Sequence, residues 1–226
     1  MSSFSKMLEQ LLPDGVIVEC GDPERSSIDL LPAERALVER AVEKRQREFR
    51  MGRHCARTAL QRLGIVDFAV LVGNNREPLW PAGVVGSITH TRGFCAAAIA
   101  PSSHFVGIGI DAEVAEPLEP SIAAAVATRS ETSRIDALDP GLAARVVFSA
   151  KEAFYKCQFY RTRHWLGFFD VSLELEDSGD FSATLLVDAP PLRRGFSVRG
   201  RWALTEALLF TTVCLRNDDL ALHAAR

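Results

Sequence analysis

The chain has 226 residues, of which 47% are apolar and 24% are charged, and its formal net charge is −3. This composition is that of a globular protein with enough apolar residues for a sizeable core, so it excludes disorder as the main state. The weakly acidic balance gives no general basic field, and we expect no nucleic-acid partner.

The cysteines and the N-terminal residues indicate a reducing compartment. The five cysteines are an odd number, are widely spaced and include no C-x-x-C pair, which argues against a disulfide framework and a zinc cluster. The first residues lack the basic start and apolar core of a signal peptide. No apolar run approaches the roughly 20 residues that cross a bilayer. We therefore expect a cytoplasmic protein with no membrane span.

The first half of the chain reads as one long helix followed by strands. Residues 32–63 are predicted to be helical, because Pro32 suits a first turn and Phe49, Ala56 and Leu60 repeat at helical spacing. Four β-like stretches separated by turn residues follow, at residues 66–72, 83–88, 94–100 and 105–110.

The second half repeats this order. An acidic, proline-containing loop at residues 114–120 is predicted to join the halves. Helices are predicted at 122–127 and 141–160, and strands at 168–175, 181–187, 195–204 and 207–215. Each half runs from helix to antiparallel-looking strands, which predicts an α+β fold of two pseudo-two-fold duplicated halves. We divide the chain into an N-terminal half, residues 1–110, and a C-terminal half, residues 111–226.

Two carboxylates close the segment GIGIDAE. On an extended strand Asp111 and Glu113 share one face, while Ile108 and Ile110 point to the other. Adjacent carboxylates repel each other unless a cation lies between them, and Mg²⁺ prefers such oxygen ligands. A solvated acidic turn at a strand end produces the same pattern, so the motif alone decides nothing.

A third carboxylate, Glu152, lies in the helical segment FSAKEAFYK. Ser149 and Glu152 have the spacing of a capping box, and Glu152 and Lys156 that of an i,i+4 ion pair; both explanations are structural. Against them, Glu152 falls on the aromatic stripe of the helix, where a carboxylate needs a cation or hydrogen bonds. A metal ion shared with Asp111 and Glu113 would supply the cation.

Basic and hydroxyl side chains form a second group. Arg45 and Arg53 fall at the edges of the apolar stripe that contains Phe49, so they are candidates for a phosphate ligand, whose oxygens guanidinium groups match. A solvated basic face is the alternative. Thr89 and His90 end a predicted strand and offer further donors to phosphate, although a hydrogen-bonded structural histidine fits equally.

Together these motifs resemble the 4′-phosphopantetheinyl transferase superfamily, in the branch of the surfactin-synthetase activator and enterobactin synthase component D. The resemblance covers residues 30–160. It rests on four motifs in the family order: REFRMGRHCAR, PLWPAGVVGSITH, GIDAE and KEAFYK.

The resemblance implies a reaction. Family members take coenzyme A and transfer its phosphopantetheine arm to a serine of an apo acyl- or peptidyl-carrier protein, releasing 3′,5′-ADP. It also implies Mg²⁺ as the metal, with Mn²⁺ as an alternative, two α+β halves with coenzyme A in the cleft between them, and a monomer.

The resemblance further implies roles for site residues. Asp111, Glu113 and Glu152 are the expected metal ligands; Glu152 is also the expected base, and Lys156 contacts the phosphates and assists departure of the ADP. Thr89 and His90 match the residues that hold the 3′-phosphate. The full set expected to bind coenzyme A is Arg45, Arg53, Arg57, Arg76, Thr89, His90, Lys151 and Lys156.

The chain departs from the family at two places. Members often carry a lysine in the turn at residues 74–77, where Arg76 is the candidate substitute, and the middle position of the acidic motif is Ala112. Two other functions stay open: a non-catalytic module that binds coenzyme A or a carrier protein, and a Mg²⁺-dependent phosphohydrolase.

Overall fold

The computed structural model describes residues 3–25, 28–135 and 137–224. Its first half contains α1 (Ser3–Leu11), β1 (Ile17–Gly21), η1 (Pro23–Arg25), α2 (Pro32–Arg35), α3 (Glu43–Arg62), β2 (Leu71–Val72), β3 (Pro78–Leu79), β4 (Val84–Thr91), β5 (Phe94–Pro101) and β6 (Phe105–Val114). Its second half contains α4 (Pro120–Val126), α5 (Arg129–Thr132), α6 (Pro140–Thr162), η2 (Phe168–Asp170), β7 (Val171–Leu175), β8 (Asp180–Leu185), β9 (Ser197–Leu204), β10 (Leu208–Arg216) and α7 (Asn217–Ala224).

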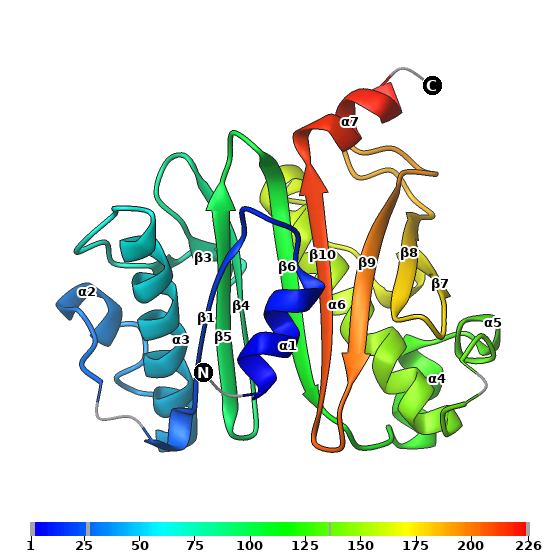
Figure 1. Cartoon of the computed structure of the whole chain (residues 1–226), viewed down its shortest axis with the longest axis horizontal. Helices are drawn as coiled ribbons and strands as arrows, with labels where there is room; N and C mark the ends of the chain where they lie inside the picture. The colour runs from blue at the N-terminus through cyan, green and yellow to red at the C-terminus, as the bar shows by residue number, and fades with distance from the viewer. Residues whose placement is uncertain (1–2, 26–27, 136, 225–226) are drawn as a thin grey trace.

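The strands form two main antiparallel sheets that stand side by side (Figure 1). One has the order β1-β5-β4 and the other the order β6-β10-β9-β8-β7, while β2 and β3 pair as a short separate hairpin. Long helices pack against sheets whose strand pairs are antiparallel, so the predicted α+β class is confirmed. β6, which contains the predicted boundary at residues 110 and 111, is one continuous strand paired with β10.

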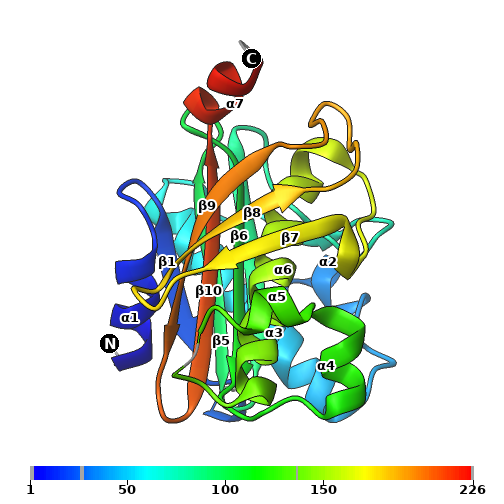
Figure 2. The same cartoon turned by 90° about the vertical axis from the view of Figure 1, so that its right-hand side faces the viewer.

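Helices cover both faces of the strands (Figure 2). On β5, Ala96 and Ala98 belong to the cluster that α1 packs against, whereas Ala97 and Ile99 belong to the cluster under α3. The same alternation governs β6, where Ile108 and Ile110 face the α1 side. The prediction that these isoleucines lie opposite the carboxylates is therefore confirmed. Across the described parts of the chain, no helix is both long and apolar enough to pass through a membrane.

Two glycines let α6 lie directly on β6. A Cβ atom added at Gly109 would stand 1.7 Å from the carbonyl oxygen of Ala153, and one added at Gly107 would stand 2.2 Å from that of Cys157. Any side chain at either position would push the helix away from the strand. The alternating glycines of the GIGID segment thus bring the α6 side chains beside Asp111.

Gly109→Ala is expected to destabilise the fold by about 1–3 kcal/mol, because the added methyl group overlaps helix backbone that has little room to move. Gly167→Ala is the matched control: its Cβ would meet nothing closer than Asp170 Oδ2 at 3.5 Å. Urea unfolding of both variants measures the difference. Equal midpoints for the two would show that α6 does not depend on this close approach.

Side-chain hydroxyls join the two sheets. Among the described strands, β4 and β6 lie next to each other but share no backbone ladder. Instead, the N–H of Ile110 donates to Ser87 Oγ at 3.1 Å, and the N–H of Ala112 donates to Thr89 Oγ1 at 3.0 Å. The hydroxyls satisfy backbone donors that a ladder would otherwise have paired. We call this junction the seam.

Each half contains the same buried ion pair. In the first, Glu34 of α2 is fully buried, pairs with Arg57 of α3 and accepts the N–H of Val70 at 3.1 Å. The Glu34 carboxylate also accepts the N–H of Leu31, the residue before α2, at 3.2 Å.

In the second half, Glu131 of α5 pairs with Lys151 of α6 at 2.9 Å and accepts the N–H of Leu173 at 3.0 Å. It also accepts the N–H of Thr128, which precedes its own short helix, at 2.8 Å. In both halves a glutamate of a short helix thus pairs with a cation of the long helix and accepts a backbone N–H from the chain beyond it. This shared arrangement agrees with a duplicated architecture.

The single helix predicted over residues 32–63 is wrong. The structure has α2, a turn region and then α3, which begins at Glu43. The side-chain amide of Gln46 donates to the carbonyl oxygens of Glu39 at 3.2 Å and Ala41 at 2.9 Å, so it satisfies backbone groups where the helix is interrupted.

The strand predicted over residues 66–72 is reduced to β2. Asp67 adopts a φ of +55°, which interrupts an extended run. The N–H of Val70 donates to the buried Glu34 instead of to a neighbouring strand.

Candidate active site

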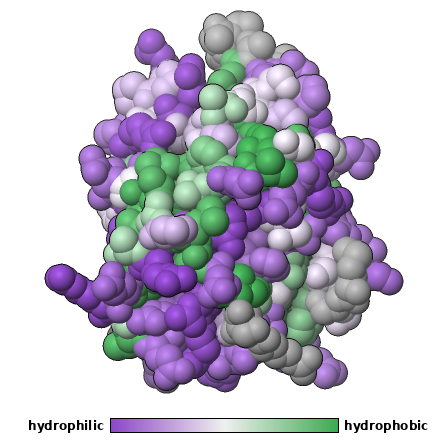
Figure 3. Space-filling model, turned by 90° about the vertical axis from the view of Figure 1, so that its left-hand side faces the viewer, coloured by the Kyte–Doolittle hydropathy of each residue, from purple (hydrophilic) through white to green (hydrophobic). Residues whose placement is uncertain are grey.

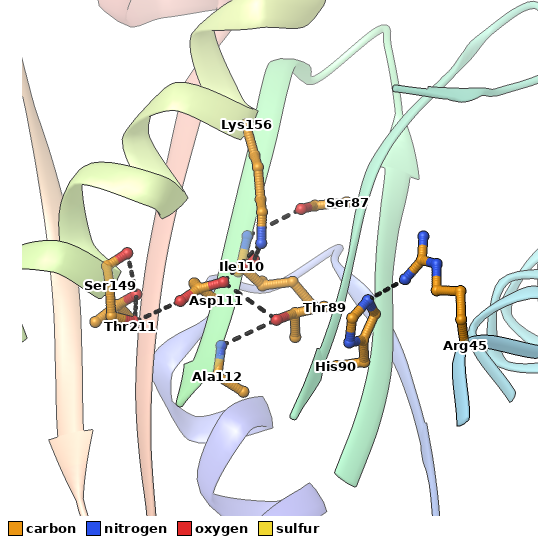
Figure 4. Close-up of polar contacts among 10 residues, drawn as sticks. All are labelled: Arg45, Ser87, Thr89, His90, Ile110, Asp111, Ala112, Ser149, Lys156 and Thr211. Carbon is orange, nitrogen blue, oxygen red and sulfur yellow. Dashed lines mark hydrogen bonds and ion pairs between the residues drawn. The ribbon is translucent and has the colours of Figure 1, made fainter. Parts of the chain in front are cut away.

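Asp111 is the centre of a polar cluster whose members come from four elements, β4, β6, β10 and α6. Its Oδ1 accepts hydrogen bonds from Lys156 Nζ at 2.7 Å and Thr89 Oγ1 at 3.2 Å, and its Oδ2 accepts one from Ser149 Oγ at 2.8 Å (Figure 4). The Ser149 hydroxyl also contacts Thr211 Oγ1 at 2.9 Å. The carboxylate is only 5% exposed, so these contacts replace its hydration.

The two structural explanations for the α6 motif are not what the structure shows. α6 begins at Pro140 and is capped by Asp139, so Ser149 lies in the helix interior and its capping role is wrong. Lys156 pairs with Asp111 and donates to the carbonyl oxygen of Ile110 at 3.1 Å. Among the described residues, no ion pair joins it to Glu152.

The other two predicted metal ligands lie near Asp111. Glu113 accepts a hydrogen bond from Arg145 Nη1 at 2.9 Å. Burial raises its pKa, the charge of Asp111 raises it further, and Arg145 opposes both. Burial also raises the pKa of Glu152, with Lys156 opposing and Asp111 adding to the effect. The charge of Asp111 therefore reaches both glutamates.

The chemistry of these groups fits a hard divalent cation. Asp111 lies close enough to Glu113 and Glu152 to raise the pKa of each glutamate, and the three carboxylates offer oxygen ligands of the type that Mg²⁺ takes, together with substrate phosphates. Within the described ranges, no three acidic, histidine or cysteine side chains are already arranged as a metal cluster. Lys156 and Arg145 neutralise two of the carboxylates in this arrangement.

A cavity of about 450 Å³ opens beside Asp111, between the α3 side and the seam. It is lined by basic side chains, namely Arg45, Arg53, Arg76, His90 and Lys156, and by two carboxylates, Glu48 and Asp111. A second cavity, of about 580 Å³, shares Arg45, Arg76, His90 and Lys156 with the first and adds Glu152. The structure thus brings most of the predicted anion-binding residues to one connected region.

His90 and Arg45 form the centre of the shared lining. Arg45 Nη1 lies 2.6 Å from His90 Nε2, and Glu48 Oε2 lies 3.6 Å from His90 Nδ1. Burial lowers the pKa of His90, while Glu48 raises it and Arg45 lowers it. A neutral imidazole accepts from Arg45 and keeps that guanidinium fixed at the edge of the cavity.

Arg53 is a buried cation that faces the first cavity. It is 6% exposed and stacks 4.3 Å from the centre of the Phe49 ring. No acceptor for its Nε lies within hydrogen-bond distance in the part of the chain that the structure describes. Burial lowers its pKa to about 10. A buried guanidinium with an unsatisfied donor matches the needs of an anionic ligand.

Three predicted site residues line neither cavity. Arg57 and Lys151 are held by Glu34 and Glu131 in the buried ion pairs of the two halves. Glu113 is turned to Arg145. Because Arg57 and Lys151 form these ion pairs away from both cavities, they are not among the residues that we propose to bind coenzyme A.

Other residues of the site escaped the sequence analysis. Arg145, Glu48, Tyr155 and Trp165 were not singled out, although Tyr155 and Trp165 line the second cavity beside Glu152. Arg145 stands seven residues before Glu152, so it projects from the same side of α6 two turns earlier. That spacing is a usable signal for its place beside the acidic group.

The entrance on the α2 and α3 side is partly apolar. Figure 3 shows this face, where apolar side chains gather within a polar border. The exposed large apolar residues of this half include Leu37, Val42, Leu71 and Leu79, and Leu37 also lines the first cavity. A ligand with both anionic and apolar parts suits such a lining.

Comparisons with known proteins agree with the site. Residues 33–100 match the 4′-phosphopantetheinyl transferase N-terminal domain, and residues 107–207 match the 4′-phosphopantetheinyl transferase superfamily.

Curated relatives give the same answer. The chain is 38% identical to 4′-phosphopantetheinyl transferase Npt of Nocardia iowensis over 92% of this chain and 99% of the relative. It is 40% identical to 4′-phosphopantetheinyl transferase Svp of Streptomyces mobaraensis over 92% and 89%, respectively. Enterobactin synthase component D of Salmonella typhi is 35% identical over 51% of this chain and 49% of its own length. The resemblance found in the motifs is confirmed: the chain belongs to the 4′-phosphopantetheinyl transferase superfamily.

Proposed function

We propose that this enzyme transfers the phosphopantetheine arm of coenzyme A to a serine hydroxyl of an apo acyl- or peptidyl-carrier protein and releases 3′,5′-ADP. The family membership supports the reaction class. The single observation that carries it is a cavity rich in arginine, histidine and lysine, in a protein of net charge −3, lined also by Asp111 and continued by a second cavity that Glu152 lines. Such a site suits a polyphosphate substrate and a divalent cation together.

Residues of the cavity hold the nucleotide in this proposal. Arg45, Arg53, Arg76 and His90 contact its phosphates, with His90 and Thr89 assigned to the 3′-phosphate. The Thr89 hydroxyl is already engaged by Asp111 and Ala112, so its contribution is to hold the end of β4 in place for His90. Remote binding of this kind orients the reacting phosphorus.

The reaction forms a bond from the serine oxygen to phosphorus and breaks the bond from phosphorus to the oxygen that leaves with 3′,5′-ADP. Glu152 takes the serine proton, directly or through water. Lys156 offsets charge on the leaving phosphate. Asp111, Glu113 and Glu152 would hold Mg²⁺, or Mn²⁺, which supplies further charge neutralisation at the pyrophosphate.

The division of the chain between residues 110 and 111, the monomeric state and the cytoplasmic location stay predictions.

Mass spectrometry of an apo carrier protein tests the function. After incubation with this enzyme, coenzyme A and Mg²⁺, the carrier is expected to gain the mass of one phosphopantetheine group, and a chelator should abolish the gain. Bound coenzyme A with no gain on several acyl and peptidyl carriers would favour a binding module. Breakdown of coenzyme A without any gain would favour a phosphohydrolase.

His90→Ala is expected to weaken binding of coenzyme A by about tenfold to a hundredfold and binding of dephospho-coenzyme A much less, since one charge-assisted hydrogen bond is worth roughly 1.5–3 kcal/mol. Isothermal titration calorimetry with both ligands measures the two losses. His104→Ala, at a histidine that lines neither cavity, is the control. Equal losses for both ligands would remove His90 from recognition of the 3′-phosphate.

A further inference from the structure

The turn between β2 and β3 is organised around Glu77. The N–H of Gly73 donates to the carbonyl oxygen of Glu77 at 2.8 Å, and the N–H of Arg76 donates to that of Gly73 at 3.0 Å. The side chain of Glu77 closes the turn, because its Oε2 accepts the N–H of Asn75 at 2.9 Å. A Cβ at Gly73 would stand 2.3 Å from Glu77 Oε1, so any side chain there would displace the carboxylate from this position.

The second oxygen of that carboxylate reaches the other half of the protein. Glu77 Oε1 accepts a hydrogen bond from Arg163 Nη1 at 2.9 Å. Arg163 is the C-cap of α6, 86 residues further along the chain. Its guanidinium lies 5.8 Å from the centre of the Phe159 ring and 5.6 Å from that of the Tyr160 ring, which restricts its position. We call the Glu77–Arg163 pair the clasp.

Two arginines at the clasp adopt backbone conformations that usually belong to glycine. Arg76 has a φ of +68° and Arg163 a φ of +55°. Left-handed backbone is unfavourable for residues with a Cβ atom, and it persists where surrounding contacts determine it. Here the contacts are those of the turn and of the clasp, and both arginines use the conformation to place a guanidinium.

The clasp joins the two walls of the second cavity. Asn75, Arg76 and Glu77 line it on one side, and α6 with the chain after it lines the other through Tyr155, Phe159 and Trp165. Arg76 borders the first cavity as well, so this residue lies where the two cavities meet. β2 and β3 pair through only two residues each, so the hairpin itself gives the turn little support.

From this geometry we infer that Glu77 and Arg163 are positioning residues that hold Arg76 where it contacts the phosphates of bound coenzyme A. The inference rests on the proposed function and extends it to two residues that no motif marks. The bond between Glu77 and Arg163 sets the distance between the turn and α6. That distance then determines where the Arg76 guanidinium lies between the two cavities.

The test begins with Glu77→Gln and Arg163→Gln. Glutamine at 77 retains an oxygen that accepts from Asn75, so the turn keeps its side-chain bond while the ion pair is lost. Each variant is expected to bind coenzyme A about threefold more weakly and to raise KM similarly with kcat unchanged, since a half-exposed ion pair is a modest interaction. Arg161→Gln removes the same charge two residues away from Arg163, outside both cavities, and serves as the control.

A second set of variants separates positioning from general stability. In an Arg76→Gln background, adding Glu77→Gln or Arg163→Gln is expected to cause no further loss of binding, because the residue they position is gone. Further losses there, or wild-type affinity in both single variants, would overturn the inference.

The failures are distinguishable. If the wild-type enzyme modifies carriers and the Glu77 and Arg163 variants bind coenzyme A equally well, only the inference about the clasp is contradicted. If the wild-type enzyme neither binds coenzyme A nor modifies carriers, the proposed function is contradicted, and so is the inference about the clasp.

Discussion

Replacing Asp111 with asparagine is expected to lower kcat/KM for carrier modification by about a hundredfold to a thousandfold, the range seen when one charge-stabilising group is removed from an active site. Asp111 is the carboxylate on which Lys156, Ser149 and Thr89 converge, and its charge reaches Glu113 and Glu152. Asparagine keeps the shape and one accepting oxygen but removes the charge that a divalent cation needs.

Carrier modification and unfolding midpoints are measured together for this variant. Glu116→Gln is the matched control, because Glu116 is an exposed carboxylate five residues away whose side chain pairs with the exposed Arg92. Asp111→Asn with near wild-type kcat/KM would remove the acidic cluster from the mechanism. A large fall in the unfolding midpoint would instead assign Asp111 a mainly structural role.

Glu131→Gln is expected to destabilise the protein by about 3–5 kcal/mol, the range for a buried ion pair that loses one partner. Lys151 would keep a buried positive charge with no carboxylate to balance it; the neutral amide oxygen and the carbonyl oxygen of Val126, at 3.1 Å, would be left to accept from it. Burial already lowers the pKa of Lys151, and Glu131 opposes that effect. Urea unfolding measures the loss.

Two further variants complete this experiment. Adding Lys151→Met to Glu131→Gln is expected to restore part of the lost stability, because the unpaired charge is removed. Glu34→Gln, the equivalent change in the first half, should cost less, since the Arg57 side chain is 15% exposed while that of Lys151 is 3% exposed. Losses below about 1 kcal/mol for Glu131→Gln, as for a surface pair, would contradict the assigned role.

The sequence predicted what depends on local pattern. Strand alternation placed Asp111 opposite Ile110, and helical spacing located the long α6, because both rest on fixed periods of the backbone. The family motifs led to the residues that line the cavities because their order and spacing are specific.

What the sequence could not supply depends on partners far along the chain. Arg57 and Lys151 lie within the family motifs, but the motifs do not reveal that Arg57 forms an ion pair with Glu34 and Lys151 one with Glu131. Ser149 has the local spacing of a helix cap, yet its hydroxyl bonds to Asp111, 38 residues away. The ends of α3 and β2 likewise depend on Gln46 and Glu34, whose contacts no window of the sequence reveals.

The seam gives this protein an unusual mechanical property. A backbone ladder resists sliding because many bonds must break together, whereas Ser87 and Thr89 hold β6 through hydroxyls that turn about a single torsion each. The two sheets are therefore joined at this point through two side-chain χ1 angles and not through a ladder. Since the Thr89 hydroxyl also donates to Asp111, a shift of β4 against β6 would move a hydrogen-bond donor of the central carboxylate.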